Sequence, residues 1–166
     1  MPPHISYLSE RLALGHDASG FSCGNESLDS WLRGHALTAQ DKGVAVTYVW
    51  LEGDRVLAYF AISPTLIDSQ LLPRSAASRL VVVPAYLLGK LALDRSLHGQ
   101  GVGERLLTQA LARVANITAE GGGRLLVVDA IDDDAAAFYA HFGFIAIPGT
   151  SRLYMKLSTI RRAMGA

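Results

Sequence analysis

The segment 85–120 constrains the fold of this chain more than any other part of the sequence. It begins with AYLLGKLALD (85–94), which is apolar on both faces and therefore predicts a central strand. It ends with ERLLTQALARVANITAE (104–120), in which apolar residues recur at helical spacing. Three glycines stand at alternate positions between strand and helix: Gly99, Gly101 and Gly103. Because glycine is a poor helix former, this pattern indicates that the segment needs backbone without side chains for a functional reason.

A strand, a glycine-rich turn and a helix together form a binding site for anions. The backbone N–H groups and the positive end of the helix point to one place, and glycine lets a phosphate approach without a Cβ in the way. A Walker A loop would need Lys followed by Ser or Thr after the last glycine, whereas this chain has Glu104 and Arg105. A dinucleotide fingerprint would need a glycine where Leu106 stands. Both nucleotide-binding patterns therefore fail.

A third pattern, a basic residue or Gln followed by x-x-Gly-x-Gly/Ala, fits His98, Gly101 and Gly103. It resembles the pyrophosphate loop of the GNAT superfamily of acyl-CoA N-acetyltransferases. A second match is DDDAAAFYAHFGF (132–144), where that family commonly has Asn-x-x-Ala-x-x-x-Tyr-x-x-x-Gly-Phe. The residues that fit are Ala135, Tyr139, Gly143 and Phe144, and Asp132 replaces the usual Asn. The resemblance covers nearly the whole chain.

Three stretches narrow the resemblance to a subfamily: FSCGNESLDSWL (21–32), LLGKLALDRSLHGQGVG (87–103) and AAAFYAHFGF (135–144). They look like the GNAT toxins of bacterial toxin–antitoxin pairs, the TacT/AtaT type, which acetylate the free amino group of aminoacyl-tRNA and block translation. The resemblance implies a homodimer, a ribbon-helix-helix antitoxin, and contact with operator DNA only through that antitoxin. The alternatives are a GNAT enzyme that acts on a small-molecule amine or a protein N-terminus, and a module that binds CoA without turnover.

The resemblance implies acetyl-CoA as co-substrate and gives roles to particular residues. The loop 99–104 would hold the pyrophosphate, and the backbone of the preceding strand would pair with the pantetheine arm. The expected coenzyme-binding residues are Leu91, Ala92, Leu93, His98, Gly99, Gln100, Gly101, Val102, Gly103, Glu104, Asp132 and Phe138. Tyr139 is expected to protonate the departing sulfur, because a phenol with a pKa of about 10 is protonated at neutral pH and is close enough to a thiol for transfer.

No residue stands out as a general base, which bears on the acceptor. A lysine ammonium, with a pKa of about 10.4, must first lose a proton, whereas an α-amino group at about 7.7–8.0 is already partly neutral at pH 7. The sequence therefore favours an α-amine, with Glu52, Asp68 or a chain of waters as alternative bases. A tRNA acceptor needs cations beside the site. The candidate substrate-binding residues are Arg33, Arg74, Arg79 and Lys90.

Composition limits the remaining possibilities. With 166 residues, of which 50% are hydrophobic, the chain predicts a single folded GNAT domain, 1–166. Because the formal net charge is zero, the chain as a whole is not attracted electrostatically to polyanions or acidic membranes. The one cysteine, Cys23, suits a reducing compartment, and no stretch reaches the roughly 20 apolar residues that span a bilayer, so we expect a cytoplasmic protein. The scattered histidines predict no metal site.

The rest of the chain predicts an α/β (α+β) fold. We expect strands at 4–14, 124–130, 144–148 and 151–158, a hairpin over 44–63, helices at 25–43 and 132–142, and irregular structure with at most a short helix over 64–84. The C-terminal TIRRAMGA is either a tail or a short helix. The resemblance implies the GNAT fold, a mixed, mostly antiparallel sheet of about six or seven strands, flanked by about four helices and splayed at the central strands.

Overall fold

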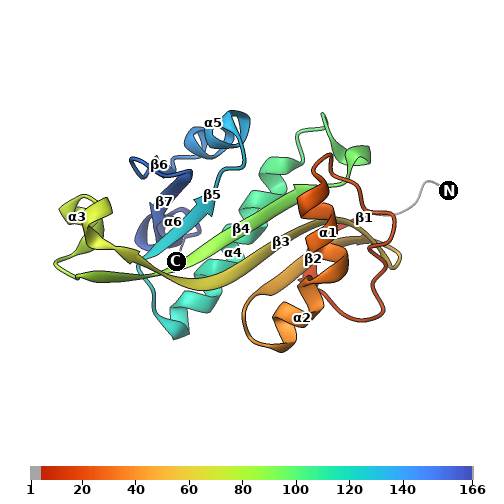
Figure 1. Ribbon diagram of the computed structural model, residues 1–166, viewed down its shortest axis with the longest axis horizontal. Helices are drawn as coiled ribbons and strands as arrows, with labels where there is room; N and C mark the ends of the chain where they lie inside the picture. Colours follow the sequence, from red (N-terminus) through yellow and green to blue (C-terminus); the bar gives the residue numbers. More distant parts are fainter. Residues whose placement is uncertain (1–4, 166) are drawn as a thin grey trace. The chain divides into compact units, whose positions relative to one another are not determined.

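The computed structural model describes residues 5–165, which form one mixed sheet of seven strands together with six helices. The strands lie in the order β1-β2-β3-β4-β5-β7-β6 (Figure 1). Their bounds are β1 Ile5–Arg11, β2 Val46–Glu52, β3 Arg55–Asp68, β4 Val82–Leu93, β5 Leu125–Asp129, β6 Ile145–Ala146 and β7 Arg152–Lys156. β4 and β5 are parallel, whereas β1–β2, β2–β3, β5–β7 and β6–β7 are antiparallel. The predicted mixed, mostly antiparallel sheet is confirmed.

The helices are α1 Glu26–Gly34, α2 Ala36–Asp41, α3 Arg74–Ala77, α4 Gly103–Gly121, α5 Asp133–His141 and α6 Leu157–Ala163, with single 3-10 turns at Ser69–Leu71 and Arg95–Leu97. The chain divides into two compact units. Unit 1 consists of the chain as far as Ile62 together with Lys90–Ala110, and unit 2 consists of Ser63–Gly89 and the chain from Leu111 onward.

Unit 1 has helices on both faces of its strands (Figure 1). On one face, Val49 of β2 packs in a buried cluster with Leu32 of α1 and Ala36 of α2. The next residue, Trp50, points to the other face, where its Nε1 donates a hydrogen bond of 2.8 Å to Gln109 of α4. Alternation of side chains along a strand produces this division. The first part of α4, which follows the glycine loop, is therefore fixed to the sheet.

Unit 2 has a core of its own around β5. Leu125 and Val127 belong to a buried cluster that also contains Ala76 of α3 and Tyr154 of β7. All four residues Leu125–Val128 are fully buried, as expected of a strand that is apolar on both faces. The parallel register runs from Ala85↔Leu125 to Leu88↔Val128, and β4 continues beyond it to Leu93.

The helix predicted over 25–43 is in fact two helices. α1 ends at Gly34 and α2 begins at Ala36, because His35 between them has a φ of −130°. The His35 N–H donates to the carbonyl of Trp31, and its own carbonyl accepts from Ala39, so the break satisfies both helices. The apolar face continues across the break, since Leu37 packs against the same cluster as Leu32.

The expectation for 64–84 is confirmed in the middle of the segment and wrong at both ends. β3 continues through Pro64 to Asp68, and β4 begins at Val82, so only residues 69–81 leave the sheet, and these include the short helix α3. Proline removes one backbone donor but keeps a φ that a strand accepts. The C-terminal stretch belongs to a helix, α6, and the described residues form six helices where about four were expected. Residue 4 of the strand predicted over 4–14 lies outside the described residues, and β1 ends at Arg11.

Candidate functional site

The glycine loop in unit 1 leads into the first turn of α4, which begins at Gly103. Gly99 and Gly101 have φ angles of +75° and +72°, a conformation that favours glycine. A Cβ at either position would meet no atom within 4 Å and would project into open space. The first N–H groups of a helix have no acceptor within the helix. The loop therefore presents bare amides at a positive helix end, which suits an anionic group.

A hollow of about 530 Å³ lies against this loop. Its lining residues are Gln100, Gly101, Val102, Glu104, Arg105 and Thr108. The guanidinium of Arg105 lies 5.0 Å from the centre of the Tyr7 ring, which holds a cation at the hollow beside the acidic Glu104. In the sequence, Arg105 serves only to exclude a Walker A loop, although its place in the first turn of α4 was a signal that it could line the hollow.

His98 and Gln100 bind back onto the turn that precedes the loop. The Nε2 of His98 lies 2.9 Å from the carbonyl oxygen of Leu93, and the Nε2 of Gln100 donates to the carbonyl of Ser96 at 2.8 Å. Both side chains are exposed. On β4, Ala92 is buried and Leu91 and Leu93 are half-buried, so these three residues offer a ligand mainly their backbone.

Helix α5 in unit 2 carries the second predicted group of residues. Asp132 is its N-cap, and the Oδ1 of Asp132 accepts the N–H of Ala135 at 2.8 Å. The carboxylate that replaces the family's Asn therefore fixes the start of the helix. Phe138 is half-buried and contacts the rings of Phe142 and Tyr139 edge-on.

Tyr139 is 5% exposed and lies between two aromatic rings. Phe138 and Phe144 both contact it edge-on, with ring centres 5.5 Å away. Among the described residues, none accepts a hydrogen bond from the Tyr139 hydroxyl. Burial, and to a smaller extent the carboxylate of Asp129, raise the pKa of Tyr139 above its ordinary value, so the phenol keeps its proton at neutral pH.

Two of the predicted substrate-binding cations, Arg33 and Lys90, lie in unit 1. Their side chains contact residues of α1 or of the segment that precedes it. The Nη1 of Arg33 donates to the carbonyl of Phe21 at 2.8 Å, and its Nη2 lies 3.3 Å from Glu26. The Nζ of Lys90 lies 4.6 Å from the ring centre of Trp31. Trp31 is half-buried: it packs against the buried cluster of unit 1 and also forms this cation–π pair.

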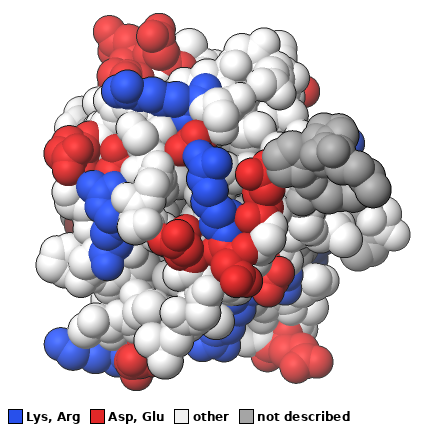
Figure 2. Space-filling view, turned by 90° about the vertical axis from the view of Figure 1, so that its right-hand side faces the viewer, with Lys and Arg blue, Asp and Glu red and all other residues white. Residues whose placement is uncertain are grey.

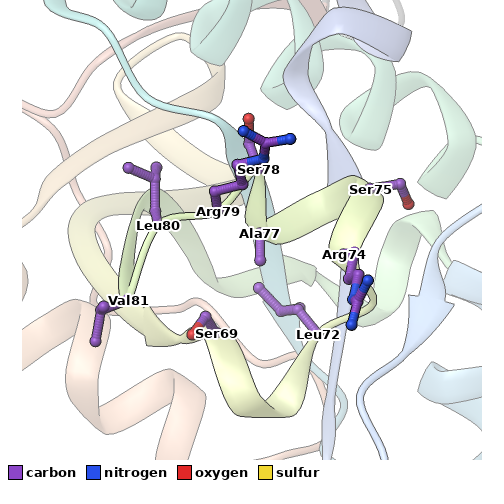
Figure 3. A pocket seen from close by; sticks show the side chains of 9 residues that line it. All are labelled: Ser69, Leu72, Arg74, Ser75, Ala77, Ser78, Arg79, Leu80 and Val81. Atoms are coloured by element: carbon purple, nitrogen blue, oxygen red, sulfur yellow. The ribbon is translucent and has the colours of Figure 1, made fainter.

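The other two, Arg74 and Arg79, lie in unit 2 and line one hollow of about 800 Å³ (Figure 3). Arg74 begins α3, and Arg79 follows its end. Leu72 and Leu80 give the hollow apolar walls. Ser78 and Arg79 have φ angles of 52° and 66°, which is unusual for residues other than glycine. Arg74 and Arg79 thus lie at the two ends of one short segment that lines this hollow.

The alternative bases are engaged in local contacts. Glu52 lies 3.8 Å from Arg55, and the Oδ1 of Asp68 accepts the N–H of Gln70 at 2.9 Å. No group of His, Cys, Asp and Glu side chains in residues 5–165 could hold a metal ion. Within the same residues, every helix is too short or too polar to cross a bilayer.

Comparison with known proteins yields a family match and close relatives. The family described as acetyltransferase (GNAT) domain matches residues 43–146. A tRNA-acetylating toxin of Mycobacterium tuberculosis (strain ATCC 25618 / H37Rv) is 33% identical over 148 residues, which are 89% of each chain. AtaT complexed with acetyl-methionyl-tRNAfMet is 26% identical, with a TM-score of 0.87 over 97% of this chain and 99% of that chain. A tyrosine-to-phenylalanine variant of AtaT, bound to the C-terminus of the antitoxin AtaR and to acetyl-CoA, is 25% identical, with a TM-score of 0.84 over 98% of this chain and 99% of that one.

Proposed function

Because this chain belongs to the GNAT acetyltransferase family, we propose that it transfers the acetyl group of acetyl-CoA to the α-amino group of an aminoacyl-tRNA and thereby blocks translation. The observation that carries the proposal is the loop of bare amides at the start of α4, in a chain whose relatives acetylate tRNA. The structure of AtaT with acetyl-methionyl-tRNAfMet supports the choice of acceptor.

The coenzyme-binding part of the proposal rests on unit 1. The amides of 99–104 bind the diphosphate, and the backbone of Leu91–Leu93 binds the pantetheine arm. The fit is favourable because a Cβ at Gly99 or Gly101 would occupy the open space that a phosphate needs. When bound, acetyl-CoA supplies a thioester whose acyl carbon is open to attack by an amine. The residues of 99–104 do not take part in that step; they hold the diphosphate.

The chemical part rests on Tyr139 of unit 2. As the amine attacks and the carbon–sulfur bond breaks, the sulfur takes up the electron pair, and the Tyr139 hydroxyl gives it a proton. The nitrogen, now bonded to the acyl carbon, releases a proton to solvent, and the Tyr139 phenolate takes one up, so that the step leaves the amide and the free thiol of CoA. Its raised pKa keeps the phenol protonated at neutral pH, and no described residue accepts a hydrogen bond from it, so the hydroxyl has a proton to give. Phe138 packs against the ring of Tyr139 and orients it, and Asp132 fixes the helix that carries both.

The acceptor part rests on the four cations and on the nature of the amine. Arg33, Arg74, Arg79 and Lys90 contact phosphates of the tRNA. On the described part of the face in Figure 2, Lys and Arg side chains are interspersed with Asp and Glu and form no continuous basic surface. With a formal net charge of zero, affinity for tRNA has to come from a few placed cations and not from a general positive charge. An α-amine needs no strong general base at neutral pH.

The proposal extends to the protein's surroundings. We expect a single catalytic domain over 1–166 that works in the cytoplasm as a homodimer. A ribbon-helix-helix antitoxin would hold it inactive and would alone contact operator DNA. The complex of AtaT with the C-terminus of AtaR supports an antitoxin partner.

Transfer of labelled acetyl groups tests the function directly. Purified protein with labelled acetyl-CoA should label charged tRNA, and prior deacylation of that tRNA should abolish the labelling. Label that appears on deacylated tRNA would refute the α-amine acceptor. Transfer to small amines or to peptide N-termini, with none to charged tRNA, would select the small-amine alternative. Binding of CoA with no transfer to any amine would select the non-catalytic module.

A further inference from the structure

Two Asp-x-Ser turns in unit 1 have the same local geometry but different surroundings. In the first, the Oδ1 of Asp17 accepts both the N–H and the hydroxyl of Ser19, at 2.9 and 2.6 Å. In the second, the Oδ2 of Asp94 accepts both the N–H and the hydroxyl of Ser96, at 3.1 and 2.7 Å. Asp17 is exposed, whereas Asp94 is buried at 5% exposure, directly before the turn that leads to the glycine loop.

The second oxygen of Asp94 makes a contact that Asp17 does not make. Its Oδ1 accepts the N–H of Ser22 at 3.0 Å, from a residue 72 positions away, and Arg55 lies 4.0 Å from Oδ2. Burial would raise the pKa of Asp94, but the donors at Ser22 and Ser96 and the charge of Arg55 outweigh it and lower that pKa. The carboxylate is thus ionised and fully hydrogen-bonded at neutral pH.

Backbone hydrogen bonds also join Ser22 to the segment 94–95. The N–H of Arg95 donates to the carbonyl of Ser22 at 2.8 Å, so both backbone groups of Ser22 bind the segment 94–95. The N–H of Asp94 donates to the carbonyl of Leu57 on β3 at 2.8 Å. Asp94 therefore joins three parts of unit 1 at the point where β4 leaves the sheet toward the glycine loop.

From this arrangement we propose that Asp94 is the positioning residue of the coenzyme loop: its carboxylate anchors the start of the loop to Ser22. His98 and Gln100 extend the anchored turn, since their side chains bind the carbonyls of Leu93 and Ser96. A loop that is held in its binding conformation loses less entropy when a diphosphate binds. The inference rests on the proposed binding of the coenzyme by 99–104.

Asp94→Asn tests the proposal, with Asp17→Asn as the matched control. The amide keeps the size of the carboxylate but loses the charge and one acceptor. Asp94→Asn should raise the Kd for CoA, measured by calorimetry, and the KM for acetyl-CoA by about tenfold, with kcat within about twofold. Asp17→Asn should leave both constants within about twofold: it loses the same charge, but its amide oxygen can still accept both contacts from Ser19. A merely structural role of Asp94 would lower the melting temperature without separating KM from kcat.

A milder variant keeps the proposal testable if Asp94→Asn does not fold. Ser96→Ala removes one donor from an exposed position and leaves the Ser22 contact, so CoA binding should weaken by about two- to threefold. Folded Asp94→Asn or Ser96→Ala protein that binds CoA as tightly as the parent would overturn the positioning role. Equal losses in the Asp94 and Asp17 variants would also overturn it. A parent protein that binds no CoA would instead refute the proposed function, and calorimetry on the parent decides that first.

Discussion

Two buried tyrosines, one in each unit, show how the same residue type is used differently. Tyr59 on β3 of unit 1 is fully buried, and its hydroxyl donates a hydrogen bond of 2.7 Å to the carbonyl of Leu28 on α1. Tyr139 on α5 of unit 2 is buried almost as completely, but its hydroxyl donates to none of the described residues. Burial is the main cause that raises the pKa of both phenols; for Tyr59, the carboxylate of Asp29 and the ionised form of Cys23 add to it.

The two tyrosines differ in whether the hydroxyl proton already forms a hydrogen bond within the protein. The Tyr59 hydroxyl joins a strand to a helix, so its role is structural. The Tyr139 hydroxyl keeps its donor capacity for a ligand, so it can serve as an acid. Burial and a raised pKa are therefore not enough to identify a catalytic phenol, and a free hydroxyl beside them is the distinguishing observation.

The largest expected effect is that of Tyr139→Phe. Removal of the proton donor should lower kcat for acetyl transfer to charged tRNA by about 100-fold or more, because general acid catalysis contributes that much. The KM for acetyl-CoA should stay within about twofold, since 99–104 binds the coenzyme. Initial rates at saturating acetyl-CoA measure the effect. Parental kcat in the variant would remove the acid assignment, and a parallel loss in CoA affinity would indicate a binding role instead.

The sequence predicted what depends on local pattern. The apolar strand 85–94, the glycines after it and the helix 104–120 are each specified by neighbouring residues, and the structure has strand, loop and helix there. The path of 64–84 was not predictable in the same way. Its three prolines indicate interruption, but pairing within the sheet carries β3 through Pro64. Tertiary pairing outweighs local preference at such positions.

The candidate site was predictable only in part, for the same reason. The motifs identify Gly101 and Tyr139 because both lie within short patterns. Asp94 and Ser22 are 72 residues apart, and no local spacing connects them. Nor could the sequence separate Tyr59 from Tyr139 by environment, because the acceptor at Leu28 becomes a neighbour only in the folded chain.

The next largest effect is expected for Gly101→Ala, which tests unit 1 as Tyr139→Phe tests unit 2. Alanine at a φ of +72° costs about 1–2 kcal/mol, and its Cβ would enter the space proposed for the diphosphate. The Kd for CoA should therefore rise by about tenfold or more while kcat changes little. Gly53→Ala is the matched control, because Gly53 has a φ of +60° in the β2–β3 turn. If both variants bind CoA alike, the loop is not the coenzyme site.

A smaller effect is expected for Tyr59→Phe, the same substitution as Tyr139→Phe in the other unit. Loss of the bond to Leu28 should lower the free energy of unfolding by about 1 kcal/mol. Since the hydroxyl does not act on a substrate, kcat should stay within about twofold. Urea denaturation and initial rates on the same preparation measure both quantities. A large fall in kcat without a fall in stability would abolish the distinction between the two tyrosines.

The smallest effect is expected in the pH dependence of stability, where the two tyrosines should behave alike. An unfolded tyrosine ionises at a pKa of about 10, and in the folded protein the pKa of each phenol is higher. The stabilisation is thus complete below pH 10 and is lost as the pH rises above it, by about 0.4 kcal/mol per tyrosine at pH 10. Each Tyr→Phe variant should lose less stability than the parent between pH 8 and about pH 10, by that amount. Denaturation at several pH values measures this difference.

If the two variants show the same loss of stability at alkaline pH but different kcat values, then the free hydroxyl, and not the raised pKa, makes Tyr139 the acid. If instead only Tyr139→Phe reduced the loss of stability at alkaline pH, burial would not oppose ionisation of Tyr59. The two tyrosines would then differ in more than the hydrogen-bond partner of the hydroxyl.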